Sequence, residues 1–322
     1  MIAARENLFD SFLKKQDELA WNRVLSELIP LIHPADQVAT QIWFSFWPLK
    51  LARTLRESVD PSLTAKEMLL DGRYRLAEQI DSSVAFLYGS RYWHQVRGVL
   101  VENAETCGGI QDLELESIIR GVAKAAAARA QSPVPILMGI SAVGCMILQQ
   151  VGLAVLAASA RNTTPPPQEG CSADEVMKRR NSRPKQGLFG FLKSTDKRYT
   201  VIFDENRKES SFEAVRGQDL SMACATDRRD NESGDHRCIE GPIPCQCRSG
   251  ACGYCWIGVL NGKERLSEAT DFELKRLSYF GYSSSDRNGD PHPHIRLACQ
   301  AKCYGDVTIV IPPWNGVLNG RA

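Results

Sequence analysis

Four cysteines in the last third of the chain constrain its fold more than any other feature. Cys247, Cys252 and Cys255 are spaced C-x4-C-x2-C, and 43 residues separate Cys255 from Cys299. A two-iron centre needs four thiolates, and a short loop can supply three of them only if it curls around the metal. Gly250 lies in this loop and can adopt the positive φ that such a curl requires. The pattern therefore predicts a [2Fe–2S] centre with these four ligands.

The residues between these cysteines are mostly small. Arg248, Ser249, Gly250 and Ala251 fill the C-x4-C step, and Gly253 lies in the C-x2-C step. Small side chains leave backbone N–H groups free to point at the bridging sulfides, where hydrogen bonds tune the reduction potential. We therefore expect the four residues of the first step to form an amide shell around the centre.

Residues 198–312 resemble the plant-type (β-grasp) [2Fe–2S] ferredoxin domain, over a little more than a third of the chain. Cys247, Cys252 and Cys255 fall on the three loop ligands of that family, and Cys299 falls on the fourth. The resemblance implies a β-grasp fold, one-electron transfer and a reduction potential on the order of −400 mV. No substrate-transforming residues are visible, so we expect an electron carrier and not an enzyme by itself.

The expected secondary structure of this region also fits the family. Alternating β-branched and aromatic residues predict strands at 199–204 and 211–215. Further strands are expected at 256–260, which the turn Asn261–Gly262 ends, and at 306–311, which closes the sheet. Helices are expected at 218–227 and 267–277, the second with Ser267 as its N-cap. Two polar stretches, 228–241 and 281–294, are longer than the family usually has and are interpreted as loop insertions. They leave the ligands intact but change the surface that a partner would meet.

The cysteines admit other interpretations. A zinc site usually has paired C-x2-C steps, and one such step is present here; a set of disulfides is the other alternative. Cys245 lies two residues before Cys247, and as first ligand it would give C-x6-C, a looser fit to the family spacing. Cys245, Cys224, Cys238 and Cys303 are then left over. They are either buried free thiols, or a second metal site or redox-active pair.

The first part of the chain, 1–160, has a different character. Segments with 3.6-residue periodicity follow one another from residue 6 to about 130 and predict an all-α domain, without a phosphate loop or a nucleophile-and-base signature. Trp43 and Trp47 share a helix face, which we expect to lie in the core, with a partner-binding surface as the alternative. His33 and His94 could ligate a haem, but a surface or core role is expected more often for a lone histidine.

Residues 133–160 are 28 positions without a charge. Their length permits a membrane span, but Gln149 and Gln150 near the middle favour a central helix of the all-α domain. From 161 to 197 the composition is that of a linker, rich in proline and then basic. The apolar segment 187–193 follows the basic residues, so membrane association at 133–160 or at 187–193 remains an alternative.

Charge and cysteine usage narrow the function classes. With 39 Lys and Arg against 38 Asp and Glu, the chain gives no electrostatic reason to expect a nucleic-acid partner. Eleven cysteines without an apolar leader predict a cytoplasmic location, at the inner face of the membrane if the protein associates with it. From Thr195 onward the chain has 17 Lys and Arg and 18 Asp and Glu. It therefore lacks the strongly acidic character by which freely diffusing ferredoxins are attracted to basic partner surfaces.

Together these features predict an α+β chain with an all-α domain at 1–160, a linker at 161–197 and a β-grasp ferredoxin-type domain at 198–322. We expect the electron-transfer subunit of a larger oxidoreductase complex, anchored by its helical domain. The alternatives are a redox sensor with a helical output domain, a free ferredoxin carrier, and a component that also binds flavin or haem in its helical half.

Overall fold

The computed structural model describes residues 8–106, 114–159, 172–181, 197–207, 209–282 and 290–318. The chain divides into two compact units, the first made of Met1–Arg53 and Arg75–Met177 and the second of Thr54–Tyr74 and Lys178–Ala322. The second unit thus takes Thr54–Tyr74 from the part of the chain that the sequence analysis assigned to the helical domain. The proline-rich segment 163–168 and the apolar segment 187–193 lie outside the described residues.

The first unit is helical. Its helices are α1 (Leu8–Lys14), α2 (Glu18–Leu28), α3 (Pro34–Phe46), α6 (Ile80–Ser83), α7 (Trp93–Thr106), α8 (Leu115–Ala130), α9 (Val134–Val151) and α10 (Leu153–Ser159), with 3-10 turns η1 (Ile29–Leu31), η2 (Leu76–Glu78) and η3 (Tyr88–Tyr92). The division between the units passes through α4 (Leu49–Glu57) and α11 (Ala173–Asn181). Because α11 is a helix, the range 161–197 is not linker throughout.

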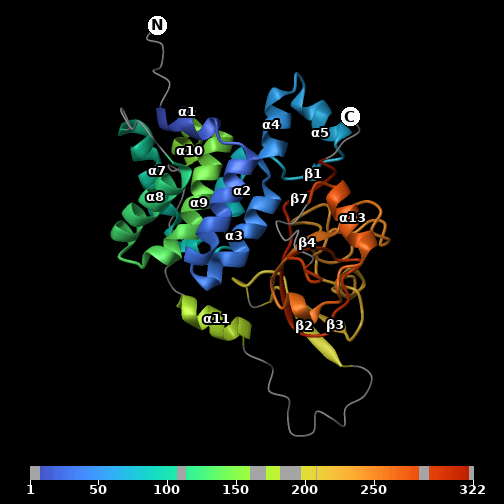
Figure 1. Ribbon diagram of the computed structural model, residues 1–322. Helices are drawn as coiled ribbons and strands as arrows, with labels where there is room; N and C mark the ends of the chain where they lie inside the picture. The colour runs from blue at the N-terminus through green and yellow to red at the C-terminus, as the bar shows by residue number, and fades with distance from the viewer. Residues whose placement is uncertain are drawn as a thin grey trace. The chain divides into compact units, whose positions relative to one another are not determined.

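Helix α9 forms the core of the helical unit. It contacts α1, α2, α3, α7, α8 and α10, and Figure 1 shows it in the middle of these helices. Its mean hydropathy is 1.8 over 18 residues, of which 72% are buried, and it is the one helix of the described residues long and apolar enough to cross a membrane. Close packing accounts for its small residues, since a Cβ at Gly144 would lie 2.8 Å from Leu100 Cδ1.

Three expectations for this unit can be compared with the structure. Within the apolar segment predicted at 133–160, the described residues form two helices and not one, because Gly152 adopts φ +80° and ends α9. Trp43 and Trp47 are buried, which confirms their place in the core. His33 caps α3, its Nδ1 accepting a hydrogen bond from Ala35 N at 3.2 Å.

The second unit contains a five-stranded mixed sheet in the order β3-β2-β6-β4-β5. Its strands are β2 (Arg198–Ile202), β3 (Ser211–Val215), β4 (Trp256–Asn261), β5 (Ile295–Leu297) and β6 (Val307–Val310). Strands β2 and β6 pair in parallel, and the other three pairs are antiparallel. Alternate side chains of β2 and β3 are buried, as expected for a sheet with one face on the core. The chain therefore belongs to the α+β class.

Helices and a second, two-stranded sheet complete this unit. The helices are α5 (Pro61–Glu67), α12 (Leu220–Cys224) and α13 (Asp271–Tyr279), with a 3-10 turn η6 (Lys263–Arg265). β1 (Asp71–Gly72) pairs antiparallel with β7 (Trp314–Asn315), although more than 200 residues lie between them. This pairing fixes Thr54–Tyr74 within the second unit.

The predicted start of α13 at Ser267 is wrong. Thr270 is the N-cap, and its hydroxyl accepts a hydrogen bond from Glu273 N at 3.2 Å. Ser267 is engaged in tertiary contacts instead: its carbonyl accepts from Arg296 Nη1 at 2.7 Å, and its hydroxyl accepts from Lys302 N at 3.2 Å. Helix α12 is likewise shorter than the predicted range 218–227.

Candidate metal centre

Strand pairing brings two of the predicted ligands together. Cys255 directly precedes β4, and Cys299 follows the end of β5 by two residues. Trp256 is paired with Leu297 in an antiparallel ladder. The residues just before Trp256 and just after Leu297 therefore lie side by side. A hydrogen bond from Ala298 N to Cys255 O, 2.9 Å long, continues the ladder, and the two thiols are in hydrogen-bond contact.

The other two predicted ligands form a second pair. Cys252 N donates to Cys247 Sγ at 3.4 Å, and the two thiols are also in hydrogen-bond contact. Cys255 and Cys299 are buried, Cys252 is half-buried and Cys247 is exposed. The four cysteines thus form an inner pair and an outer pair.

The loop curls as its glycines predict. Gly250 has φ +77° and Gly253 has φ +69°, in the region that favours glycine. A Cβ at Gly250 would lie 2.9 Å from Phe272 Cε1, and one at Gly253 would lie 2.6 Å from Phe280 Cδ2. Both the backbone angle and the packing therefore require glycine at these positions. Arg248 also has a positive φ, of +54°.

Arg276 of α13 orients the loop from outside. Its guanidinium donates to the carbonyl of Gly250 at 3.3 Å and also to the carbonyl of Ala251. In a trans peptide the N–H points opposite to the carbonyl. Holding the Ala251 carbonyl therefore directs the N–H of Cys252 to the other side, where it meets Cys247 Sγ.

Further backbone N–H groups of the predicted amide shell reach thiol sulfurs. Ser249 N donates to Cys247, Gly250 N to Cys299, and Arg248 N to Cys245. Just outside the shell, Tyr254 N donates to Cys252 Sγ at 3.4 Å. These donors surround the thiols with positive ends of peptide dipoles, which favour a negative charge on sulfur.

The thiol pKa values differ within each pair. Burial opposes ionisation of Cys247, but the hydroxyl and N–H of Ser249 outweigh it and lower the pKa of this thiol to about 6. The pKa of Cys299 is lowered by its hydrogen bond with Cys255, whose own pKa is raised by its contacts with Cys245 and Cys299. Burial raises the pKa of Cys252. Each pair therefore contains one thiol that ionises readily, and the thiolate is the form that binds metals.

Cys245 lies closer to this centre than its spacing suggested. Its hydrogen bond with Cys255 lowers the pKa of its thiol to about 7, although burial opposes this. Three other cysteines of the second unit behave as structural thiols. Cys224, Cys238 and Cys303 donate to the carbonyls of Ser221, Pro242 and Gly305, each at 3.2 Å, and burial raises their pKa values to about 12, 12 and 11.

One hydrogen-bond network at the loop could not be expected from the sequence. The Tyr254 hydroxyl donates to Asp71 Oδ2, and Asp71 Oδ1 lies 2.9 Å from His236 Nε2. Asp71 is in β1, far away in the sequence, and His236 is in the polar stretch 228–241. Neither residue has a local pattern that could have indicated this contact.

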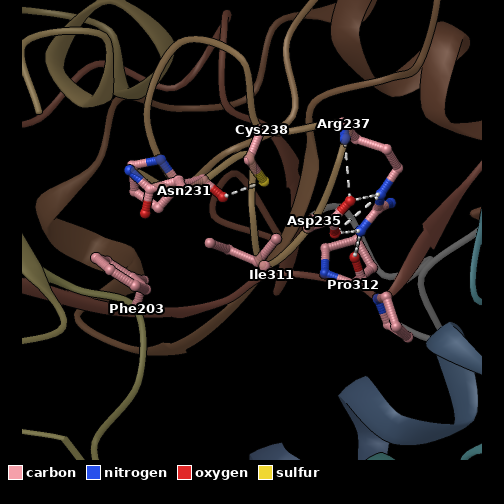
Figure 2. A pocket seen from close by; sticks show the side chains of 10 residues that line it. Phe203, Asn231, Asp235, Arg237, Cys238, Ile311 and Pro312 are labelled. Atoms are coloured by element: carbon pink, nitrogen blue, oxygen red, sulfur yellow. Dashed lines mark hydrogen bonds and ion pairs between the residues drawn. The ribbon is translucent and has the colours of Figure 1, made fainter. Parts of the chain in front are cut away.

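The same polar stretch lines a pocket of about 270 Å³. Figure 2 shows Phe203, Asn231 and Ile311 on one side and Arg237 beside Asp235 and Pro312 on the other. Arg237 donates from Nε and Nη2 to Asp235 and from Nη2 to Pro312 O at 2.9 Å. Because Asp235 neutralises the guanidinium, the pocket offers little attraction to an anion.

Two observations limit the kinds of site that the cysteines can form. Among the described residues, no group of three or more His, Cys, Asp or Glu side chains is arranged to hold a metal ion. All nine cysteines in those residues are free thiols.

No protein-family model matches this chain, and no solved structure matches it.

Proposed function

We propose that the second unit is a β-grasp ferredoxin-type domain that holds a [2Fe–2S] cluster and transfers single electrons. Its ligands would be Cys247, Cys252, Cys255 and Cys299. The observation that carries this proposal is the division of these four thiols into two contacting pairs. Four cysteines shared between two irons give two thiolates to each iron, which matches this division.

The alternatives fit the donor set less well. A structural zinc site needs four ligands around one point, and the described residues hold no group of three or more His, Cys, Asp or Glu side chains arranged in that way. Disulfides would join thiols directly, whereas backbone N–H groups here point at the sulfurs of Cys247, Cys252 and Cys299. Donors to sulfur stabilise thiolate ligands and tune the potential of an iron–sulfur cluster.

The topology supports the β-grasp part of the proposal. The first and last strands of the five-stranded sheet, β2 and β6, lie next to each other in parallel, with the antiparallel hairpin partner β3 outside β2 and the β4–β5 pair outside β6. This arrangement places Cys255 and Cys299 at neighbouring strand ends, as the family resemblance requires. When bound, the cluster would supply one-electron redox chemistry.

The exposed side of the loop suits contact with a redox partner. Cys247, Ser249 and Ala251 are exposed, so a partner can approach the outer pair of thiols closely. Two exposed apolar side chains border the loop: Met222, 43% exposed and 3.2 Å from Arg248 Nη1, and Phe272, 49% exposed and packed against Gly250. Exposed apolar side chains of this kind favour a stable complex with a partner protein over transient binding that is guided by opposite charges. We therefore propose an electron-transfer subunit of a larger, cytoplasmic oxidoreductase assembly.

One observation favours the redox-sensor alternative. The Tyr254 hydroxyl binds Asp71, and the chain continues on both sides of Thr54–Tyr74 into the helical unit. A change at the cluster loop could therefore be passed to the helical unit along the chain. The sensor predicts a change in oligomeric state or partner binding on reduction.

The test is anaerobic reconstitution of the full chain with iron and sulfide. We expect about two irons and two sulfides per chain, and a rhombic EPR signal after reduction. Cys252→Ala should lose the cluster, whereas the matched control Cys303→Ala, which removes a buried thiol bonded to Gly305, should keep it. Zinc bound in place of iron, or equal loading of both variants, would refute the proposal.

A further inference from the structure

Strand β3 lies at one edge of the five-stranded sheet, so half of its backbone groups are not used by β2. In an antiparallel ladder, residues that bond to the neighbouring strand alternate with residues that do not. The hydrogen bond from Phe203 N to Ser210 O, 2.9 Å long, fixes this alternation for β2 and β3. The N–H and C=O groups of Ser211, Glu213 and Val215 therefore point away from β2, and an edge of this kind can pair with a strand of another molecule.

Both ends of this outward edge are already occupied. At one end, Gln218 Oε1 accepts from Val215 N and Gln218 N donates to Val215 O, both at 2.9 Å. At the other end, Ser211 N donates to a neighbouring carbonyl, and Ser211 O accepts from Arg229 Nη2 at 2.7 Å. In the described part of the chain, the N–H and C=O of Glu213 are the outward groups of β3 that remain without a partner.

Arg229 occupies the Ser211 end with a side chain that is held in place. Its Nη1 donates to the carbonyl of Glu209, beside the bond from Nη2 to Ser211 O. Its Nε donates to Asp227 Oδ1 at 2.8 Å, and the Asp227 side chain is only 6% exposed. The guanidinium carbon lies 5.7 Å from the centre of the Phe203 ring, within the range of a cation–π contact. These contacts fix a charged group across the backbone edge.

We propose that Arg229 is an edge guard, a side chain that prevents β3 from pairing with the β3 strand of a second copy of this chain. A strand that joined β3 would need the Ser211 carbonyl, which Arg229 occupies, and it would bury the guanidinium charge. Charged side chains at sheet edges protect other proteins from such pairing. Arg229 belongs to the polar stretch 228–241, and this role for it does not depend on a bound metal.

The pairing that Arg229 prevents would be antiparallel and two-fold. Glu213 would lie opposite Glu213 of the second copy, and Ser211 would lie opposite Val215. Within the five-stranded sheet, β3 is the edge that another molecule can approach, because the residues of β5 at the opposite edge are buried. Association through β3 should therefore stop at a dimer.

The experiment measures the mass of the full chain in solution by light scattering after size-exclusion chromatography, over a range of concentrations. With rising concentration, Arg229→Ala should approach about twice the mass of the wild type. Arg228→Ala is the matched control, because Arg228 is exposed, has no described contact with β3 and carries the same charge. Its mass should equal that of the wild type. If the wild type or Arg228→Ala associates as strongly as Arg229→Ala, the guard is refuted.

A milder variant keeps the test valid if Arg229→Ala does not fold. Asp227→Asn retains the guanidinium but removes the carboxylate charge that holds it, so its mass should rise less than that of Arg229→Ala and more than that of Arg228→Ala. A mass of Asp227→Asn and of every folded Arg229 variant equal to that of the wild type would overturn the proposal.

A second substitution tests whether the association uses β3. The N–H of Glu213 points away from β2, so Glu213→Pro removes an outward donor and leaves the β2–β3 ladder intact. Arg229→Ala/Glu213→Pro should therefore return to the wild-type mass. In Arg229→Ala, the Glu213 amide should exchange its hydrogen several-fold more slowly at high than at low protein concentration, because pairing protects it. A double variant as heavy as Arg229→Ala, or a Glu213 exchange rate independent of concentration, would contradict the proposal.

Discussion

The buried ion pair between Glu273 of α13 and Arg296 of β5 should be essential for the stability of the second unit. Both side chains are almost fully buried, 0% and 1% exposed, and two hydrogen bonds of 2.9 Å join them. Glu273 Oε1 also accepts from Leu297 N at 2.8 Å. Replacing Glu273 with Gln keeps the shape of the side chain but leaves the Arg296 charge uncompensated and turns an amide N–H toward its donors.

Breaking a buried pair from one side costs about 3–5 kcal/mol. At a urea slope of about 2 kcal/mol/M, this lowers the unfolding midpoint of the second unit by roughly 1.5–2.5 M. The measurement is a urea titration of the apo-protein. Glu213→Gln is the matched control, because Glu213 pairs with Arg198 at the surface, where both side chains are 63% exposed, and its loss should cost under about 1 kcal/mol.

A double replacement tests the electrostatic reasoning itself. Glu273→Leu combined with Arg296→Met removes both charges, and it should be less destabilising than either single change, since buried pairs can often be replaced by apolar side chains. A loss below about 1 kcal/mol for Glu273→Gln would refute the argument. So would a double variant whose loss equals the sum of the two single losses.

Three further predictions concern other parts of the chain. Gly253→Ala should lower the free energy of unfolding by about 2–6 kcal/mol, because of backbone strain and the contact with Phe280. Gly234→Ala is the control and should be nearly neutral, since its Cβ would lie 3.6 Å from the nearest atom, Asn231 O. Equal effects of the two changes in thermal unfolding would contradict this. Gln149→Leu should destabilise the helical unit by about 1–3 kcal/mol in detergent-free buffer, because Gln149 accepts from Trp21 Nε1 at 2.6 Å; a lipid-facing α9 would instead be stabilised. Burial alone would raise the pKa of Asp71, but hydrogen bonds from Tyr254 and His236 lower it below 3.8. A depressed carboxyl pKa stabilises the fold above the unfolded-state pKa, and this contribution is lost as the pH falls through the folded-state pKa. The Tm advantage of the wild type over Asp71→Asn should therefore be full near neutral pH and shrink below about pH 4; an advantage independent of pH would rule this out.

Local patterns in the sequence predicted much of the second unit. Strands β2 and β3 lie where alternating residues indicated them, and β4 and β6 lie where apolar segments indicated them. The N-cap of α13 was misplaced because Ser267 and Thr270 are both good caps, and only tertiary contacts decide between them. Ser267 is already bound by Arg296 and Lys302, which leaves Thr270 for the helix.

The division into units could not be predicted from local patterns. β1 consists of Asp71 and Gly72, too short to show an alternation, and its partner β7 is far away in the sequence. The cysteine spacing favours Cys247 as the first ligand and leaves Cys245 and Cys303 as thiols that could lie close to the same centre, but only the packing of distant segments puts Cys245 against Cys255. Both contacts depend on how distant segments pack, and no window of sequence contains that information.

The pairing of β1 with β7 also sets the order in which the protein can be completed during synthesis. Asp71 leaves the ribosome long before its partner Asn315. At about 5–20 residues per second, the wait lasts roughly ten to fifty seconds. The helical unit can fold in that time with Thr54–Tyr74 still unpaired, and Tyr254 has no Asp71 in place until the last strand arrives. Until then the loop of Cys247, Cys252 and Cys255 lacks one of the contacts that hold it in its final form.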